Sequence, residues 1–270
     1  MSEPFDLGRI GGEPALEALV EAVRDAGAEA RRLFSLGRAH VELKPDRSPV
    51  TAADRAVEER LSAFTAARHP GLPFLGEETG LRPGSSELSW LVDPIDGTRA
   101  FVRGMPTWSV LVALLERGEP ALAIGYFPAD EDLYVAVRGH GARRNGERLS
   151  VSAVASLSDA AVSHGSLVQF GGARGLGLLG ALRDRTHTQR GYADLDGHRN
   201  VLLARADAMI DPAVQPWDAA VPMLLVREAG GAATGLLGGA SLAQVAVEGG
   251  LVTSNGAVHD ELLALLAADL

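Results

Sequence analysis

The chain has 270 residues and a formal net charge of −10 at pH 7, from 35 acidic and 25 basic side chains. This acidic balance disfavours nucleic acid or an anionic membrane surface as the main partner, and a composition of 46% hydrophobic and 22% charged residues excludes intrinsic disorder. The absence of cysteine excludes disulfides, thiolate metal sites and a cysteine nucleophile. No apolar run approaches the roughly 18 residues of a membrane span, so we expect a cytoplasmic protein.

The first half of the chain has the pattern of two helices followed by a sheet. Apolar residues recur every three or four positions over residues 14–36 and again over residues 52–68, where Thr51 is the expected N-cap. A polar loop over residues 44–50 separates the two predicted helices. Short apolar runs bounded by turn residues predict strands over residues 72–75, 88–92, 108–115, 121–127 and 133–137, and Asn145-Gly146 predicts a hairpin.

The second half of the chain alternates between strand and helix patterns. Strands are predicted over residues 160–163, 208–210, 244–247 and 251–253, and helices over residues 177–185, 197–206, 217–229 and 256–267. We therefore expect an α/β fold, of the layered α+β kind. Residues 1–150 would form an N-terminal α+β half and residues 151–270 a C-terminal α/β half, within one compact unit.

Acidic residues occur where the flanking sequence predicts turns, strand ends or helix starts. Taken singly, Asp54, Glu78 and Asp218 are most simply helix caps or partners of a helix dipole. The segment Asp93-Pro94-Ile95-Asp96 is different, because it follows an apolar strand and because proline suits the first position of a helix. Residues three apart lie on one helix face, so the two carboxylates should converge at the end of the strand.

The pair Asp93 and Asp96 predicts a metal site, because two carboxylates held so close repel each other unless a cation lies between them. Neither cysteine nor histidine adjoins them, and an all-oxygen ligand set selects a hard ion such as Mg²⁺, with Mn²⁺ or Ca²⁺ as competitors. Gly97 and Thr98 follow directly, and small residues at a helix start offer backbone N–H groups to a phosphate. An acid-lined pocket holds a phosphate dianion only when bound cations reverse its charge. The sequence therefore predicts a combined metal and phosphate site.

Taken together, these motifs resemble those of the inositol monophosphatase family, whose members are Mg²⁺-dependent, lithium-sensitive phosphatases. Their order and spacing match along nearly the whole chain, in the loop from Asp46 to Asp54, Glu77-Glu78, the run from Asp93 to Thr98, Trp217-Asp218-Ala-Ala, Ser254-Asn255-Gly256 and His259-Asp260. The resemblance implies a five-layer αβαβα sandwich, commonly assembled as a homodimer.

The resemblance also implies a role for each motif residue. Five residues would hold two or three Mg²⁺ ions, with Mn²⁺ as a substitute: Glu77, Asp93, Ile95 through its carbonyl, Asp96 and Asp218. Thr98 and Asp54, with Glu77, would be the catalytic residues that orient and deprotonate the attacking water, while the amides of Gly97 and Thr98 bind the phosphate. Two cations that activate the water and stabilise the leaving alkoxide account for in-line displacement without a covalent intermediate.

The segment from Arg190 to Asp218 is similar to the histidinol-phosphate phosphatases of this family. These enzymes carry a Gly-Asp-aromatic-Trp-Gly-His or Tyr stretch, an acid seventeen residues after its Asp, and a Pro-Trp-Asp motif. The chain matches this pattern at Asp194, Gly197, His198, Asp211 and 216–218. It departs from the pattern where Ala193 replaces the glycine, Leu195 the first aromatic residue and Asp196 the tryptophan. We therefore expect L-histidinol phosphate as the substrate, and inositol-1-phosphate, NADP or a nucleotide 3′-phosphate as the alternatives. The residues expected to bind the substrate are Asp194, Asp211, Arg190 and His198, with Asp196 as a third acid beside its ammonium group. A non-catalytic metabolite sensor would lack some of the metal ligands, and none is missing.

Overall fold

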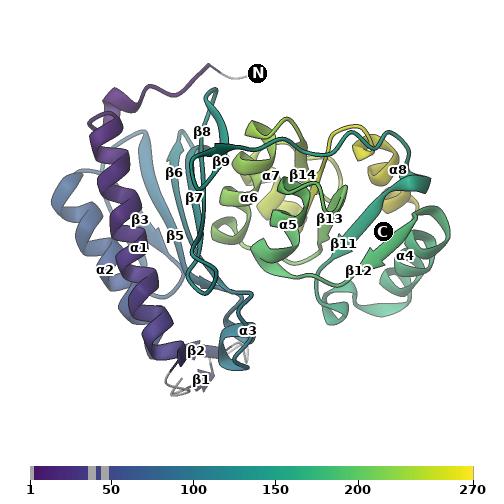
Figure 1. Ribbon diagram of the computed structural model, residues 1–270, viewed down its shortest axis with the longest axis horizontal. Helices are drawn as coiled ribbons and strands as arrows, with labels where there is room; N and C mark the ends of the chain where they lie inside the picture. The colour runs from purple at the N-terminus through teal and green to yellow at the C-terminus, as the bar shows by residue number, and fades with distance from the viewer. Residues whose placement is uncertain (1–2, 36–40, 44–48, 270) are drawn as a thin grey trace.

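The protein is described by a computed structural model covering residues 3–35, 41–43 and 49–269. It has five layers, which Figure 1 shows from left to right, as the fold class predicted. Helices form the outer and central layers, and two sheets lie between them. The first layer contains the helices α1 (Glu13–Ser35) and α2 (Ala52–Arg68). The central layer contains α5 (Asp194–Leu202), α6 (Pro216–Glu228) and α7 (Leu242–Glu248). The last layer contains α4 (Gly172–Arg185) and α8 (His259–Asp269).

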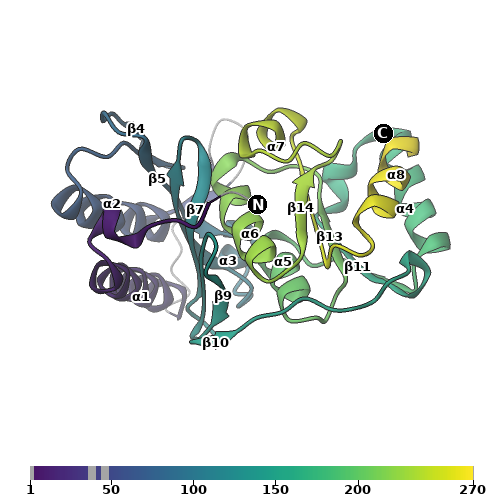
Figure 2. The same cartoon turned by 90° about the horizontal axis from the view of Figure 1, so that it is seen from above.

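The first sheet has eight strands in the spatial order β10-β9-β8-β7-β6-β5-β3-β4, and every neighbouring pair is antiparallel except β3 and β5. Its strands are β3 (Phe74–Gly76), β4 (Gly80–Arg82), β5 (Leu88–Asp96), β6 (Ser109–Glu116), β7 (Glu119–Phe127), β8 (Asp132–Val137), β9 (Gly141–Arg144) and β10 (Glu147–Arg148). The short helix α3 (Thr98–Val102) follows β5. Figure 2 shows α1 and α2 side by side on the outer face of this sheet.

The second sheet has five strands in the order β12-β11-β13-β15-β14. They are β11 (Ala161–His164), β12 (Thr188–Arg190), β13 (Ala208–Asp211), β14 (Ala232–Gly235) and β15 (Leu251–Ser254). The pairs of β11 with β12 and β13 are parallel, and β15 runs antiparallel to both of its neighbours. A separate antiparallel pair, β1 (Val41–Leu43) and β2 (Pro49–Thr51), leads into α2, so the end of the predicted loop is a strand, while residues 44–48 lie outside the described part.

Both faces of β6 are buried, which explains its nearly continuous apolar sequence. Val110 and Val112 belong to the hydrophobic cluster beneath α1 and α2, whereas Leu111 and Ala113 belong to the cluster around α6. The cluster around α6 also includes Met209 of β13, so residues from both sheets meet on this central helix. A third cluster fills the space between the second sheet and the helices α4 and α8.

The structure corrects one predicted strand. Residues 244–247 belong to helix α7, because the Ser241 side chain accepts a hydrogen bond from the Gln244 N–H while the Gln244 side chain accepts one from the Ser241 N–H. Such a capping box starts a helix. The strands β4, β12 and β14 were not predicted, and the alanine and glycine residues of β14 give no β-strand signal. The predicted hairpin turn is confirmed, with φ of +49° at Asn145 and +87° at Gly146 between β9 and β10.

Within the described ranges, no helix is both long and apolar enough to cross a membrane.

Candidate active site

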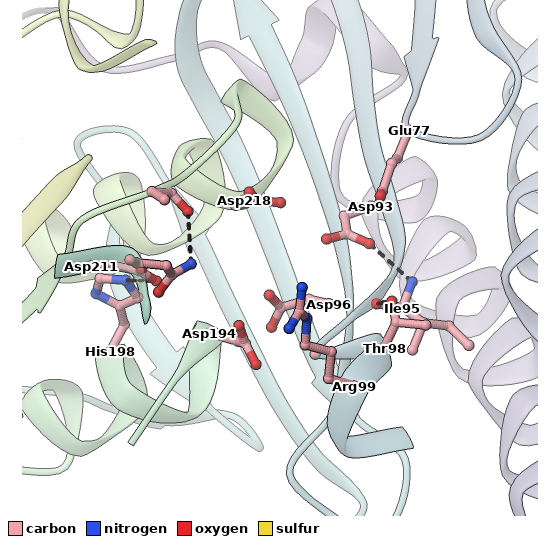
Figure 3. Close-up of a pocket in the computed structure, with 13 residues that line it drawn as sticks. Glu77, Asp93, Ile95, Asp96, Thr98, Arg99, Asp194, His198, Asp211 and Asp218 are labelled. Carbon is pink, nitrogen blue, oxygen red and sulfur yellow. Dashed lines mark hydrogen bonds and ion pairs between the residues drawn. The ribbon is translucent and has the colours of Figure 1, made fainter. Parts of the chain in front are cut away.

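A cavity of about 200 Å³ lies where the end of the first sheet faces the central helices and β13. Figure 3 shows side chains from both halves of the chain pointing into it. Six carboxylates line this cavity: Glu77, Asp93 and Asp96 from the first half, and Asp194, Asp211 and Asp218 from the second. Ile95, Gly97, Thr98 and His198 line it as well, so the structure brings together most of the residues that the sequence assigned to the site.

The segment from Asp93 to Asp96 is the end of strand β5, which corrects the predicted helix start. Along a regular strand, residues three apart point to opposite faces. Here the pairing of β5 with β6 shifts register between Asp93 and Asp96, and this bulge turns both carboxylates into the cavity. The chain leaves the sheet only at Gly97, whose φ of +80° is the left-handed conformation that glycine adopts without strain.

Asp96 connects the two halves of the site. Its Oδ2 accepts hydrogen bonds from the Ser109 hydroxyl at 2.7 Å and from the Leu195 N–H at 2.9 Å. Ser109 begins β6, whereas Leu195 belongs to the first turn of α5. The predicted metal residue is therefore bonded directly to the segment that was expected to bind the rest of the substrate.

Asp54 does not line the cavity itself, but it lies behind Thr98, which does. The N–H and the hydroxyl of Thr51 donate to Asp54 Oδ2 at 2.8 and 2.6 Å, which fixes the carboxylate at the start of α2. The Thr98 hydroxyl lies 2.8 Å from the Ile95 carbonyl oxygen and 3.4 Å from Asp54 Oδ1. Burial raises the pKa of Asp54, the bonds from Thr51 oppose this shift, and the charge of nearby Glu77 adds to it.

The carboxylates share one electrostatic problem, which is that burial and mutual repulsion both disfavour their charged forms. Burial, with the neighbouring carboxylates second, raises the pKa of Asp93 and of Asp96 well above the usual range. Burial likewise raises the pKa of Asp194 to about 6, of Asp218 to about 7 and of Asp211 to about 8. A site of this kind holds protons unless a cation replaces them.

The donor set fits a hard divalent cation, because every candidate ligand is an oxygen atom. In the described residues, no group of three or more Asp, Glu or His side chains is gathered closely enough to hold a metal ion. The carboxylates thus surround the cavity without converging on one point. Binding of a cation would require some of these side chains to move inward.

These pKa shifts predict how stability depends on pH. The folded-state pKa values of Asp194, Asp218 and Asp211 lie above the value of about 3.9 in an unfolded chain. At any pH between the unfolded and the folded pKa values, the folded protein therefore binds more protons than the unfolded chain. Without divalent cations, the free energy of unfolding should therefore fall as pH rises from about 4 to about 8, by on the order of 5 kcal/mol or more. Thermal unfolding at a series of pH values measures this loss.

Mg²⁺ should remove most of the loss, so its stabilising effect should be larger at pH 8 than at pH 5. A melting temperature that rises steadily with pH in the presence of a chelator would contradict this prediction.

The far end of the cavity is formed by Asp194, Asp211 and His198. Asp194 has a φ of +58°, a strained backbone conformation that aspartate tolerates better than most residues. The carboxylate of Asp194 lies close to the backbone of Gly97, since a Cβ atom added at Gly97 would lie 3.0 Å from Asp194 Oδ2. His198 is 2% exposed, its Nδ1 lies 2.8 Å from the Thr253 hydroxyl, and its Nε2 lies 4.0 Å from Asp211 Oδ2. Burial lowers the pKa of His198 to about 3. The imidazole that faces Asp211 is therefore neutral.

Asp196, which was expected to be a third acid for the substrate, does not line the cavity. It pairs with Arg199 one turn later on α5 at 2.6 Å, and Arg199 also contacts Asp130 at 3.0 Å and stacks on the Phe127 ring. Asp196 therefore belongs to an ion-pair network beside the site.

Arg190 also lies outside the cavity. It is exposed at the end of β12, where it donates to the Thr188 hydroxyl and to the Gln189 carbonyl, and it lines a separate cavity of about 120 Å³ together with Tyr192 and Arg205. The structure therefore does not place it beside Asp194 and Asp211.

Sequence reasoning missed three residues that line the cavity, Arg99, Gln169 and Ala213. The exposed Arg99 lies close enough to Asp194 to oppose the rise in its pKa, and its position directly after Thr98 was the available signal. Gln169 lies on a single 3₁₀ turn (Leu167–Phe170), where it accepts a hydrogen bond from the Ser166 N–H. No local pattern indicates that this turn reaches the site.

Comparison with known proteins agrees with this geometry. The model of the inositol monophosphatase family matches residues 12–270. The chain is 38% identical over 256 residues to the histidinol-phosphatase of Mycobacterium tuberculosis, which covers 93% of this chain and 97% of the relative. It is 33% identical over 254 residues to the inositol-1-monophosphatase of Mesorhizobium japonicum, covering 92% and 94%.

Solved structures show the same fold. The extragenic suppressor protein suhB from Bartonella henselae superposes with a TM-score of 0.88 at 29% identity, covering 96% of this chain and 100% of that one. The Thermotoga maritima IMPase gives a TM-score of 0.83 at 31% identity, covering 94% and 97%. The chain therefore belongs to the inositol monophosphatase family and is a phosphoric monoester hydrolase.

Proposed function

We propose that the protein hydrolyses L-histidinol phosphate to L-histidinol and phosphate, with Mg²⁺ as its cofactor. The observation that carries the proposal is the second pair of acids in the cavity. Asp194 and Asp211 line the same cavity as the residues assigned to the metal, and we expect the organic part of a bound phosphoester to lie beside them. Carboxylates placed there suit a substrate that carries an ammonium group. The identity of 38% to a histidinol-phosphatase supports the same substrate.

The metal would be held by the carboxylates of Glu77, Asp93, Asp96 and Asp218 and by the Ile95 carbonyl. When bound, Mg²⁺ supplies an activated water and positive charge opposite the phosphate, and this is the chemistry that two-metal phosphatases use. Two or three ions per site, and Mn²⁺ as a substitute, follow from the family resemblance and stay predictions.

The remaining steps belong to the residues around the metal. The Thr98 hydroxyl, placed between the Ile95 carbonyl and Asp54, orients the attacking water. Asp54, whose Oδ1 lies 3.4 Å from that hydroxyl, accepts the proton. The amides of Gly97 and Thr98 would bind the phosphate oxygens, since the chain turns into α3 at this point.

A second candidate is inositol-1-phosphate or another small phosphomonoester, such as NADP or a nucleotide 3′-phosphate. The observation in its favour is that Leu195 and Asp196, which stand at the two aromatic positions of the histidinol-phosphatase pattern, offer no aromatic face to an imidazole. Leu195 is 2% exposed within the central hydrophobic cluster, and Asp196 is paired with Arg199. The ammonium contact must then account for most of the discrimination between substrates.

Substitution of the two substrate-facing acids tests the assignment. Asp194→Asn and Asp211→Asn should each lower kcat/KM for histidinol phosphate by about 10- to 100-fold, because each removes a charge-assisted contact from a partly desolvated pocket. The same variants should hydrolyse a small neutral phosphomonoester at nearly the wild-type rate. Phosphate release from histidinol phosphate, inositol-1-phosphate, NADP and adenosine 3′,5′-bisphosphate is the measurement.

Asp184→Asn is the matched control, since Asp184 is exposed on α4, outside the cavity, and pairs with its neighbour Arg183. Equal hydrolysis of inositol-1-phosphate and histidinol phosphate by the wild type, or an unchanged preference in both cavity variants, would favour the second candidate.

Cytoplasmic location, expected from the lack of a long apolar run, and homodimeric assembly, which the family resemblance implies, stay predictions. Cell fractionation tests the location, and light scattering on the purified protein tests the assembly.

A further inference from the structure

The carboxylate of Glu58 is fully buried, and its partners are backbone amides. Glu58 lies in the middle of α2 and is 0% exposed. Its Oε2 accepts a hydrogen bond from the Glu78 N–H at 2.8 Å, and its Oε1 accepts one from the Thr79 N–H at 2.7 Å. One side chain thus binds two consecutive peptide groups of the turn that follows β3. Bonds of this kind, with a charged acceptor, are stronger than those between neutral groups.

The chain passes so close to this carboxylate that no side chain fits between them. A Cβ atom added at Gly76 would lie 2.3 Å from Cδ and from Oε1 of Glu58. Gly76 is the last residue of β3 and directly precedes Glu77. The close approach therefore occurs at the residue next to the predicted metal ligand.

The backbone on both sides of Glu77 is fixed as a result. On the N-terminal side of the Glu77 side chain, the Glu77 N–H donates to the Val92 carbonyl at 3.2 Å. On the C-terminal side, the N–H groups of Glu78 and Thr79 donate to the Glu58 carboxylate. Parallel pairing of Gly76 with Val92 sets Glu77 beside Asp93, and Figure 3 shows both side chains at the same side of the cavity.

We propose that Glu58 is a positioning residue for the metal site, because it fixes the turn over residues 77–79 and so directs Glu77 into the cavity. Asp54 lies one helical turn earlier on the same face of α2, where it contacts Thr98. A single helix face thus positions both the residue assigned to the water and a residue assigned to the metal. The inference rests on the metal site of the proposed function and is independent of the substrate.

The test is direct titration of Mg²⁺ into metal-free protein, with no substrate present. Glu58→Gln keeps the shape and one acceptor oxygen, but it turns an NH₂ group toward one of the two backbone N–H groups. We expect Mg²⁺ to bind about 10- to 100-fold more weakly, as is usual when a residue that orients a metal ligand is replaced. In metal-free protein the amide hydrogens of Glu78 and Thr79 should also exchange with solvent at least about tenfold faster.

Glu59→Gln is the matched control, because it removes the same charge from an exposed neighbouring position on α2 and should bind Mg²⁺ like the wild type. If Glu58→Gln does not fold, Glu58→Asp keeps the buried charge but is one methylene shorter, and it is measured in the same way. Excess Mg²⁺ should restore phosphate release in either variant.

Folded variants that bind Mg²⁺ with wild-type affinity, and differ only in melting temperature, would overturn the proposal. So would faster exchange at Glu78 and Thr79 with no change in affinity. Because the titration uses no substrate, a failed screen of phosphoesters would count against the proposed function and leave this result standing.

Discussion

Phosphate release should stop when a chelator removes divalent cations from the protein, and it should return when Mg²⁺ is added back. Six carboxylates line the cavity, and a phosphate dianion that approaches them without a cation is repelled. We expect a loss of at least about 10³-fold in kcat/KM, because the metal supplies both an activated nucleophile and several kcal/mol of charge stabilisation. Colorimetric phosphate release at defined concentrations of free Mg²⁺ is the measurement.

A variant that removes one assigned ligand should reproduce this loss in the presence of Mg²⁺. Asp218→Asn keeps the volume of the side chain at the third residue of α6, where Oδ2 accepts a hydrogen bond from the Gln215 N–H at 2.7 Å. Its circular dichroism spectrum should match that of the wild type while kcat falls by orders of magnitude. Undiminished turnover in excess chelator would exclude metal-dependent hydrolysis.

Thr98→Ala should lower kcat by roughly 10²- to 10³-fold at saturating Mg²⁺ and leave residual activity. The hydroxyl orients water and does not form a bond to phosphorus in the proposed reaction, so its removal weakens positioning and proton transfer without abolishing the nucleophile. Asp54→Asn should have a comparable effect, since it replaces the proton acceptor beside that hydroxyl. Steady-state kinetics with the substrate selected by the screen give both values.

A single turnover in ¹⁸O-labelled water distinguishes direct attack by water from a covalent mechanism. Direct attack places the label in the released phosphate in one step. Isolation of a phosphorylated side chain from the stopped reaction would contradict the role assigned to Thr98.

The chemical identity of the site was predictable because its residues lie in short motifs at the ends of elements. Asp54 at a helix start and Glu77 after a short strand are visible from local sequence alone. The bulge that turns Asp93 and Asp96 to the same side was not visible, because it depends on the register between β5 and β6. The sequence therefore predicted that these two carboxylates face the same space, which the structure shows, but for the wrong geometric reason.

The misassigned role of Asp196 has a similarly specific cause. The predicted helix over residues 197–206 begins three residues earlier in the structure, at Asp194. Asp196 and Arg199 therefore both belong to α5 and lie on one helix face, where they pair. The expectation that Asp196 binds the substrate came from its place in the segment that resembles the histidinol-phosphate phosphatases, and it did not take this pairing into account.

The acidic residues of the cavity wall are divided equally between the halves of the chain, with three from each. The last of these, Asp218, lies on the helix that both sheets cover. A nascent chain that has not yet reached Trp217 therefore lacks a complete site, however well its first sheet has folded. The ability to hydrolyse substrate should therefore appear late in biosynthesis, in a single step. Binding of a divalent ion between the acidic residues of the two halves would show that the halves have packed against each other.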